Sequence, residues 1–116
     1  MEDCQRKNLN SFYPALNQDF MFHQHKGASL AGLHIMNGDV IIYTQTVANA
    51  GDGIYVFAMQ DREFCRYLKF IDSDFVEIYD LTNAVAIDDL KAEKEKINLS
   101  ALQLKGKIYA TIHTVA

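Results

Sequence analysis

The chain has 116 residues, which is enough for one domain with a hydrophobic core and too few for two. Eleven Lys and Arg against fifteen Asp and Glu give a net charge of −4, and the basic residues are scattered, which argues against direct binding to nucleic acid. No apolar stretch reaches the ~20 residues of a membrane-spanning helix, and the first residues, MEDCQRKNLN, lack the apolar segment of a signal peptide; we therefore expect a cytoplasmic protein that binds no membrane.

The N-terminal region is expected to be separate from the folded part of the chain. Residues 1–18 are predicted to form a flexible N-terminal arm, and residues 19–116 a single domain. Cys4 and Cys65 lie far apart, without a Cys-x-x-Cys motif, and are interpreted as reduced thiols in a reducing compartment.

Strand patterns dominate the rest of the chain. Short β-branched and aromatic runs alternate with turn residues about every 8–12 positions, which is typical of an all-β domain. The predicted strands are 19–26, 39–47, 54–59, 63–71, 75–79 and 102–115, with tight turns at 60–62 and 72–74. We expect residues 39–44 and 54–71 to form a twisted meander with the closing strand, near 107–114, packed beside it. Gly106 in that strand predicts a bulge or bend.

Residues 88–100, DDLKAEKEKINLS, are the exception to the strand pattern. Their carboxylates precede their lysines, and Leu90, Lys94 and Ile97 fall at helical spacing. The pattern favours a short helix and a charged loop equally.

Several weak motifs in a fixed order resemble one family. The run GASLAGLHIMNGDVIIYTQTVANAGDGIYVF, followed by DREFCRYLKF, is similar to the S24 peptidases, which include the self-cleaving domains of LexA and CI-type repressors and the mutagenesis protein UmuD. Asn83 stands where the family has an asparagine-containing turn, and LKGKIYATIHTV resembles its closing strand. The resemblance covers roughly residues 20–116. It implies a mostly-β single domain of the LexA/UmuD type, related to S26 signal peptidases, built as a twisted β-meander or partly open barrel.

The resemblance also implies a serine-lysine dyad, in which the amine takes the proton of the serine hydroxyl. It places Ser29 at the nucleophile, where Gly-Asp-Ser-Met has become Gly-Ala-Ser-Leu, and Arg66 at the lysine position. Arginine stays protonated and has no lone pair to accept a proton. We therefore interpret Ser29 as a turn residue whose hydroxyl bonds nearby backbone, and the domain as non-catalytic.

Two other residues are candidates for the missing base. Lys69 follows Arg66 by three positions and so lies on the opposite face of the predicted strand, from which it could reach Ser29 only through a bulge. His25 is the second candidate, and with His23 it could begin a metal site. Because no third ligand is near in sequence, we interpret both histidines as half-exposed and expect no metal and no cofactor.

Three functions remain open. The first is a non-catalytic dimeric interaction or regulatory module in SOS-type or phage-type regulation or mutagenesis, with a polymerase or a regulator as its protein partner. The second is an active serine peptidase that uses Ser29 with Lys69 or His25, and the third is the C-terminal dimerisation domain of a phage-type repressor. We expect a homodimer formed through Ile108, Ala110 and Ile112, predicted to share one face of an edge strand. Six aromatic residues are predicted to fill the core or the dimer face: Tyr55, Phe57, Phe64, Phe70, Phe75 and Tyr79.

Overall fold

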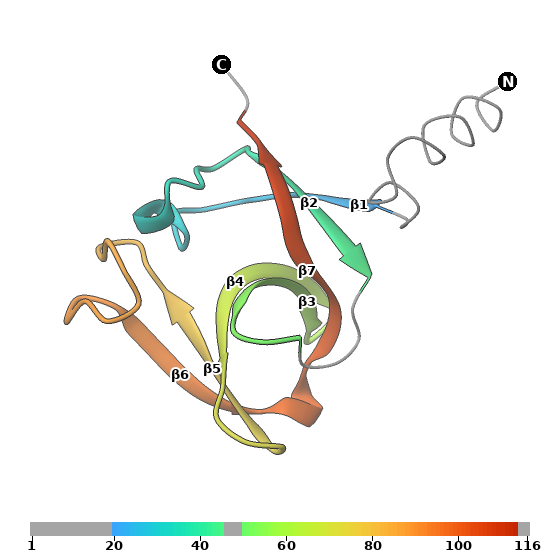
Figure 1. The fold of residues 1–116 in the computed structure, drawn as a ribbon, viewed down its shortest axis with the longest axis vertical. Coiled ribbons are helices and arrows are strands. Elements are labelled where there is room, and N and C mark those ends of the chain that lie inside the picture. The colour runs from blue at the N-terminus through green and yellow to red at the C-terminus, as the bar shows by residue number, and fades with distance from the viewer. Residues whose placement is uncertain (1–19, 46–49, 114–116) are drawn as a thin grey trace, which may run out of the picture.

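The computed structural model describes residues 20–45 and 50–113 of the chain, so the predicted arm at 1–18 lies outside the described residues. The described residues form one antiparallel sheet of seven strands, and the predicted mostly-β fold is confirmed (Figure 1). The strands are β1 (Phe20–Gln24), β2 (Val40–Gln45), β3 (Gly53–Met59), β4 (Arg62–Phe70), β5 (Phe75–Asp80), β6 (Glu93–Asn98) and β7 (Gln103–Ile112). Two short 3-10 helices, η2 (Ala31–Leu33) and η3 (Leu99–Ala101), connect strands. None of the described helices is long and apolar enough to cross a membrane.

Local turn chemistry explains the two predicted hairpins. Gln60 and Asp61 connect β3 to β4, and both have left-handed φ angles, 53° and 63°. This two-residue turn matches the twist of the strands that it joins. In the turn between β4 and β5, the Asp72 carboxylate accepts hydrogen bonds from the backbone N–H groups of Asp74 and Phe75, at 2.7 and 2.9 Å.

The strand order differs from the meander that we predicted. The sheet runs β1-β2-β7-β3-β4-β5-β6, so β7 separates β2 from β3. β7 has ten residues, long enough to pair with β2 over Gly106–Ile112 and with β3 over Gln103–Lys107. Only Gly106 and Lys107 therefore pair on both sides among the described residues, while Ile108–Ile112, for which we predicted a sheet edge, pair with β2 alone.

Two bulges shape β7. One extra residue, Lys105, interrupts the ladder with β3, and another, Tyr109, interrupts the ladder with β2. The first confirms the bulge predicted at Gly106, where a Cβ atom would collide with the carbonyl oxygen of Thr44 and the ring of Tyr43. The second reverses the alternation of side chains, because an extra residue moves all later side chains of the strand to the other face. Ile108 consequently packs against the core, and our prediction that it shares a face with Ala110 and Ile112 is wrong.

Residues 93–98, within the segment predicted as a helix or a charged loop, form the edge strand β6. Ile97 lies opposite Val76 of β5, and the Lys94 Nζ is 3.4 Å from a Glu77 carboxylate oxygen. Leu90, the first residue of the helical pattern, is fully exposed and does not pack in the core. The pairing with β5 outweighs the local helical spacing, and the charged side chains are common on an exposed edge strand.

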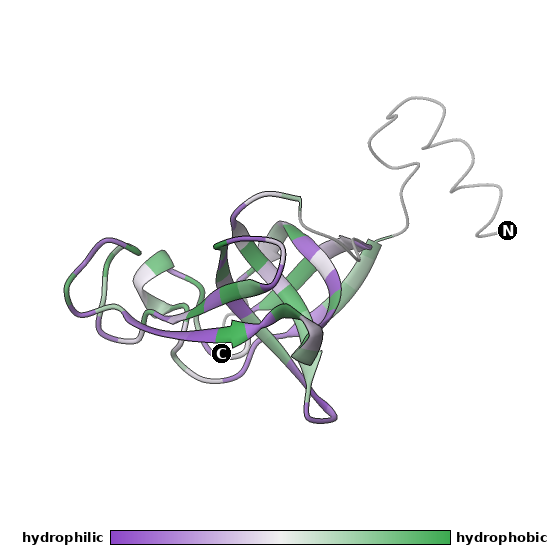
Figure 2. Cartoon of the chain, turned by 90° about the horizontal axis from the view of Figure 1, so that it is seen from below, coloured by the Kyte–Doolittle hydropathy of each residue, from purple (hydrophilic) through white to green (hydrophobic). Residues whose placement is uncertain are grey.

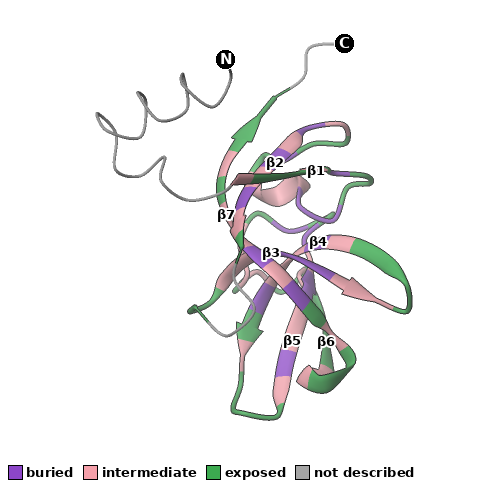
Figure 3. Cartoon of the chain, turned by 90° about the vertical axis from the view of Figure 1, so that its right-hand side faces the viewer, coloured by how far each residue is buried: buried purple, intermediate pink, exposed green. Residues whose placement is uncertain are grey.

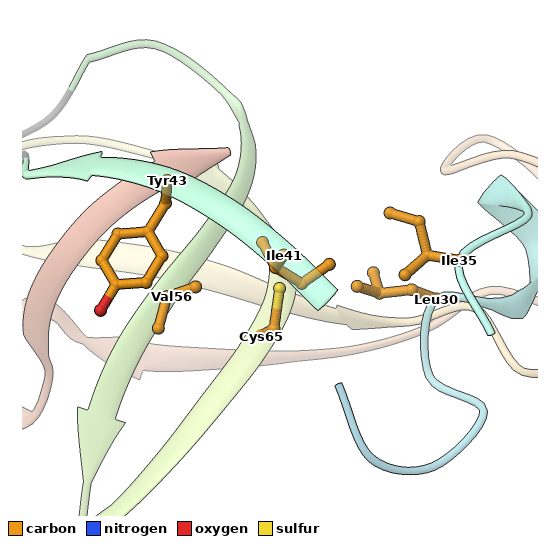
Figure 4. Close-up of a cluster of buried hydrophobic side chains, with 6 residues drawn as sticks. All are labelled: Leu30, Ile35, Ile41, Tyr43, Val56 and Cys65. Atoms are coloured by element: carbon orange, nitrogen blue, oxygen red, sulfur yellow. The ribbon is translucent and has the colours of Figure 1, made fainter. Parts of the chain in front are cut away.

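The core consists of three clusters of buried side chains, and the burial of β3, β4 and β5 is visible in Figure 3. The first cluster comprises Leu30, Ile35, Ile41, Tyr43, Val56 and Cys65 (Figure 4). The second comprises Tyr55, Phe57, Leu68, Val76 and Leu104, and the third Tyr79, Leu81 and Ala84. Of the predicted core aromatics, Tyr55, Phe57 and Tyr79 are buried, while Phe64, Phe70 and Phe75 are partly buried. Hydrophobic (green) and hydrophilic (purple) stretches alternate along the sheet in Figure 2.

Candidate functional site

Ser29 lies in the loop between β1 and β2, just before η2. Its carbonyl oxygen accepts a hydrogen bond from the backbone N–H of Leu81 at 2.8 Å, and Gly32 N–H donates to the Leu81 carbonyl at 3.1 Å. A Cβ atom at Gly32 would collide with the Ala84 carbonyl oxygen, so this close approach requires glycine. The loop is thereby held against the segment that follows β5.

The Ser29 hydroxyl is 6% exposed and has no hydrogen-bond partner. The prediction that it bonds nearby backbone is therefore wrong. Its neighbour Leu30 is fully buried in the same cluster as Cys65. Burial of Leu30 draws the serine inward with it, and this explains how a turn hydroxyl comes to lie away from water.

Arg66 lies on β4 beside Cys65. Its Nη1 donates a hydrogen bond to the Cys65 carbonyl oxygen at 2.9 Å, and its guanidinium carbon is 5.4 Å from the centre of the Phe64 ring. Burial lowers the pKa of this guanidinium from its ordinary value, and the charge of Asp80 opposes that shift. Arginine nevertheless remains a cation, so it can stabilise negative charge and cannot act as a base.

Lys69 lies on the other face of β4, as predicted. Lys69 is exposed and pairs with Glu77 of β5. The ladder between β3 and β4 has no bulge, from the pair of Met59 and Arg62 to the pair of Gly53 and Leu68. An uninterrupted strand places residues three apart on opposite faces. Lys69 is therefore not a base for a group on the Arg66 side of the strand.

His25 is 1% exposed, which corrects the prediction that it is half-exposed. Its backbone N–H donates to the Asp39 carbonyl at 2.8 Å, and its own carbonyl accepts from Gly38 at 2.8 Å. These bonds close the loop between β1 and β2 and carry the ring inward, where neither ring nitrogen has a partner. Burial, followed by the charges of Arg66 and His23, lowers the pKa of His25, while Asp39 opposes the shift.

His23, by contrast, has a partner. Its Nδ1 lies 2.5 Å from one Glu63 carboxylate oxygen, and Lys105 Nζ donates to the other at 2.7 Å. Burial raises the pKa of Glu63, but the hydrogen bonds from Lys105 and His23 outweigh it and lower the pKa overall. Within the described residues, no group of three or more His, Cys, Asp or Glu is placed to hold a metal ion.

The remaining nucleophile candidate is the Cys65 thiol. Cys65 is buried, and burial raises its pKa to about 12. A thiol with this pKa is protonated at neutral pH and is a poor nucleophile. Cys4 lies outside the described residues.

Two pockets lie around Arg66. The larger, of about 580 Å³, is lined by the end of β1 and the start of β4, including His25, Lys26, Arg62, Glu63 and Arg66. The smaller, of about 330 Å³, is lined by residues of β3, β4, β5 and β6, and it shares Phe64 and Arg66 with the larger pocket. Sequence reasoning missed Lys26 and Arg62, because these two residues come from separate segments and carry no motif.

The structure brings only part of the predicted site together. His25 and Arg66 interact electrostatically, and the neighbours of Ser29 and Arg66 share one cluster, yet the Ser29 hydroxyl bonds to neither His25 nor Arg66. A comparison with models of known protein families gives no match, and a search of curated proteins gives none either. The resemblance to S24 peptidases therefore depends on the residues of this chain alone.

Proposed function

We propose that this chain is a non-catalytic domain of the S24 peptidase type, with the partly open barrel of LexA and UmuD, and that it works as a homodimeric interaction module. The observation that carries the proposal is an exposed apolar surface on three neighbouring strands. A dimerisation domain of a phage-type repressor would use the same surface, and a polymerase or a regulator would then bind the dimer.

The apolar surface, here called the β1–β2–β7 face, follows from the register of the strands. Phe22 of β1 lies opposite Ile42 of β2, which lies opposite Ala110 of β7. Residues paired in this way share one side of the sheet. The β1–β2–β7 face comprises Phe20, Phe22, Ile42, Tyr109, Ala110 and Ile112.

Several side chains of this face are unusually exposed for their size. Phe22 is 65% exposed, Tyr109 56% and Ile112 51%, and the rings of Phe20 and Tyr109 lie 4.8 Å apart. Contiguous apolar surface of this kind marks a site of protein association. Ala110 and Ile112 of the predicted dimer contact belong to it, whereas Ile108 does not.

A free strand edge adjoins the face and favours a second copy as the occupant. Within the described residues, Ile108–Ile112 of β7 pair with β2 on one side only. Two copies of this edge can pair antiparallel about a two-fold axis, which is the commonest symmetry of homodimers. Such pairing brings the two apolar faces side by side.

The environment of Ser29 supports the non-catalytic assignment. Its hydroxyl has no base within hydrogen-bond distance, Arg66 cannot accept a proton, and Lys69 lies on the other face of β4. One observation favours the alternative of an active peptidase: His25 is buried in the same loop as Ser29, and burial lowers its pKa, which favours the neutral form that a base requires.

Sedimentation of the full chain tests the dimer. We expect a species of about twice the 13.2 kDa of one chain at micromolar concentration, and a single-chain species for Phe22→Asp, because a carboxylate in the interface would be desolvated. Leu90→Asp is the matched control, since Leu90 is equally apolar, fully exposed and in a loop outside the face. A wild-type monomer, or a Phe22→Asp dimer, would contradict the proposal.

A serine-directed covalent label tests the absence of catalysis separately. We expect no labelling of Ser29 and no cleavage of an added peptide with an Ala-Gly bond, including at alkaline pH. Labelling that disappears in Ser29→Ala and persists in Ser100→Ala would show that the serine is activated and would establish the peptidase alternative.

A further inference from the structure

The larger pocket beside Arg66 has an excess of positive charge. Its wall includes three basic side chains, Lys26, Arg62 and Arg66, against one carboxylate, Glu63. Glu63 is already bonded to His23 and to Lys105. Among the described residues, none of the three cations forms an ion pair with a carboxylate. The pocket therefore offers donors to a ligand that brings its own negative charge.

Arg66 has the donors for such a ligand. A guanidinium carries five N–H groups, of which the Cys65 carbonyl takes one through Nη1. The group is partly buried over the Phe64 ring, so water screens its charge less than that of an exposed lysine. Planar guanidinium groups bind carboxylate and phosphate oxygens in pairs.

His25 adds an independent sign that the pocket is incomplete. His25 is one of the residues that line the pocket, it is 1% exposed, and neither of its ring nitrogens has a hydrogen-bond partner. Buried polar groups in folded proteins are nearly always hydrogen-bonded, so an orphaned imidazole points to a missing partner. A neutral imidazole supplies one N–H donor, which suits an anion.

The smaller pocket, which Arg66 also lines, is unsuitable for an anion. Its charged lining comprises three carboxylates, Asp80, Glu93 and Glu95, against two cations, Lys94 and Arg66 itself. The Asp80 carboxylate accepts hydrogen bonds from the backbone and hydroxyl of Thr82 and also attracts Arg66. Carboxylates thus already outnumber cations in the smaller pocket, and a bound anion belongs to the larger one.

We propose that the larger pocket binds an oxyanion, either a carboxylate or a phosphate group, with Arg66, Arg62 and Lys26 as the charged donors and His25 as a neutral donor. The carboxylate would come from an acidic peptide or a small organic acid, and the phosphate from a phosphorylated ligand. The proposal is independent of the dimer, because none of its four residues belongs to the β1–β2–β7 face.

Titration of the full chain with inorganic phosphate and, separately, with glutarate tests the proposal and distinguishes the two sources. Binding is followed by calorimetry and by the ring resonances of His25 at constant ionic strength. We expect saturable binding of at least one anion, and a higher His25 pKa in the bound state, because a nearby negative charge favours the imidazolium.

Substitutions identify the donors. Arg66→Gln and Arg62→Gln should each weaken binding about tenfold or more, as expected for the loss of a charged hydrogen bond. Arg66→Gln should also raise the His25 pKa in the unbound protein, because it removes a repelling charge. Lys69→Gln is the matched control, since it removes the same charge from the opposite face of the same strand. Absence of saturation with both anions, or an equal effect of Lys69→Gln, would overturn the proposal.

Discussion

His25 and Ser29 are the residues whose polar side-chain atoms are buried without partners in the described part of the chain. Both are carried inward by their neighbours: hydrogen bonds to Gly38 and Asp39 close the loop around His25, and Leu30 packs into the core beside Ser29. An unpaired buried polar group costs about 1–3 kcal/mol. At the scale of single residues, these two unpaired groups therefore destabilise the folded chain, and the charge of Arg66 acts on one of them, His25.

The burial of His25 predicts a pH-dependent stability. Its pKa is lowered on folding from the ordinary 6.5, so the unfolded chain binds the proton more readily. The free energy of unfolding is therefore highest, with respect to His25, above about pH 6.5. It falls as the pH drops below that value, by up to about 1.4 kcal/mol per pH unit, until the pH reaches the pKa of His25 in the folded chain. Urea denaturation between about pH 7 and about pH 5 measures this slope.

A substitution at His25 separates its contribution to the pH dependence of stability from that of the other titratable groups. His25→Phe, which keeps an aromatic ring and removes the titration, should unfold at an equal or higher urea concentration near neutral pH and should lose the slope. The lowered pKa of Glu63 acts in a separate window, because its contribution is lost only as the pH falls below its ordinary 4.5. A His25→Phe variant with the wild-type slope would show that another group titrates.

At the scale of elements, the β3–β4 hairpin joins the site to the core. β4 carries Arg66 toward the pockets and Cys65 and Leu68 into two different clusters. Its register with β3 depends on the turn at Gln60 and Asp61, where both residues adopt left-handed backbone. That conformation is strained for residues other than glycine, since the Cβ atom approaches the following carbonyl oxygen.

Relief of this strain should stabilise the hairpin. Asp61→Gly is expected to raise the free energy of unfolding by about 0.5–1 kcal/mol, because glycine is the preferred second residue of this turn. Glu95→Gly, in the exposed edge strand β6 with extended backbone, should lower it by about the same amount. The urea midpoints of the two variants measure both effects, and a shift of the same sign in both would contradict the strain at Asp61.

At the scale of the whole molecule, β7 connects the two halves of the sheet. It pairs with β2 on one side and with β3 on the other, so within the sheet of the described residues β7 links β1 and β2 to the β3–β6 meander. Gly106 permits this central position because no side chain fits between β7 and Thr44 of β2. The second half of β7, Ile108–Ile112, extends past β3, and its unpaired side is the strand edge that we assign to the dimer.

Dimerisation should couple folding to protein concentration. If only the dimer buries the β1–β2–β7 face, the thermal midpoint of the wild-type chain rises with concentration by mass action. Phe22→Asp should show a lower midpoint that does not change with concentration, and Leu90→Asp should behave as the wild type. A hundredfold change in protein concentration should alter the stability of a dimer by about 2.7 kcal/mol. A wild-type thermal midpoint that stays constant over that concentration range would argue for a monomer.

The sequence by itself determined the features that depend on neighbouring residues. Alternation and turn residues located all six predicted strands to within a few residues, including the closing strand, predicted over 102–115 and observed as β7 at Gln103–Ile112. The bulge next to Gly106 and the outward position of Lys69 also followed from local rules, because side-chain period and glycine chemistry act over two or three residues. Ser29 and Arg66 were placed on the correct loop and strand for the same reason.

Tertiary structure alone decided the features that need partners distant in sequence. β6 is a strand because β5 offers it a ladder, although its own spacing of Lys94 and Ile97 fits a helix equally well. The Tyr109 bulge moved Ile108 into the core, and loop closure buried His25. The cationic pocket forms only where the end of β1 meets the start of β4, which lie 36 residues apart at Lys26 and Arg62. Local sequence patterns do not predict such contacts, because the contacts between distant segments are stabilised by pairing and burial that exist only in the folded chain.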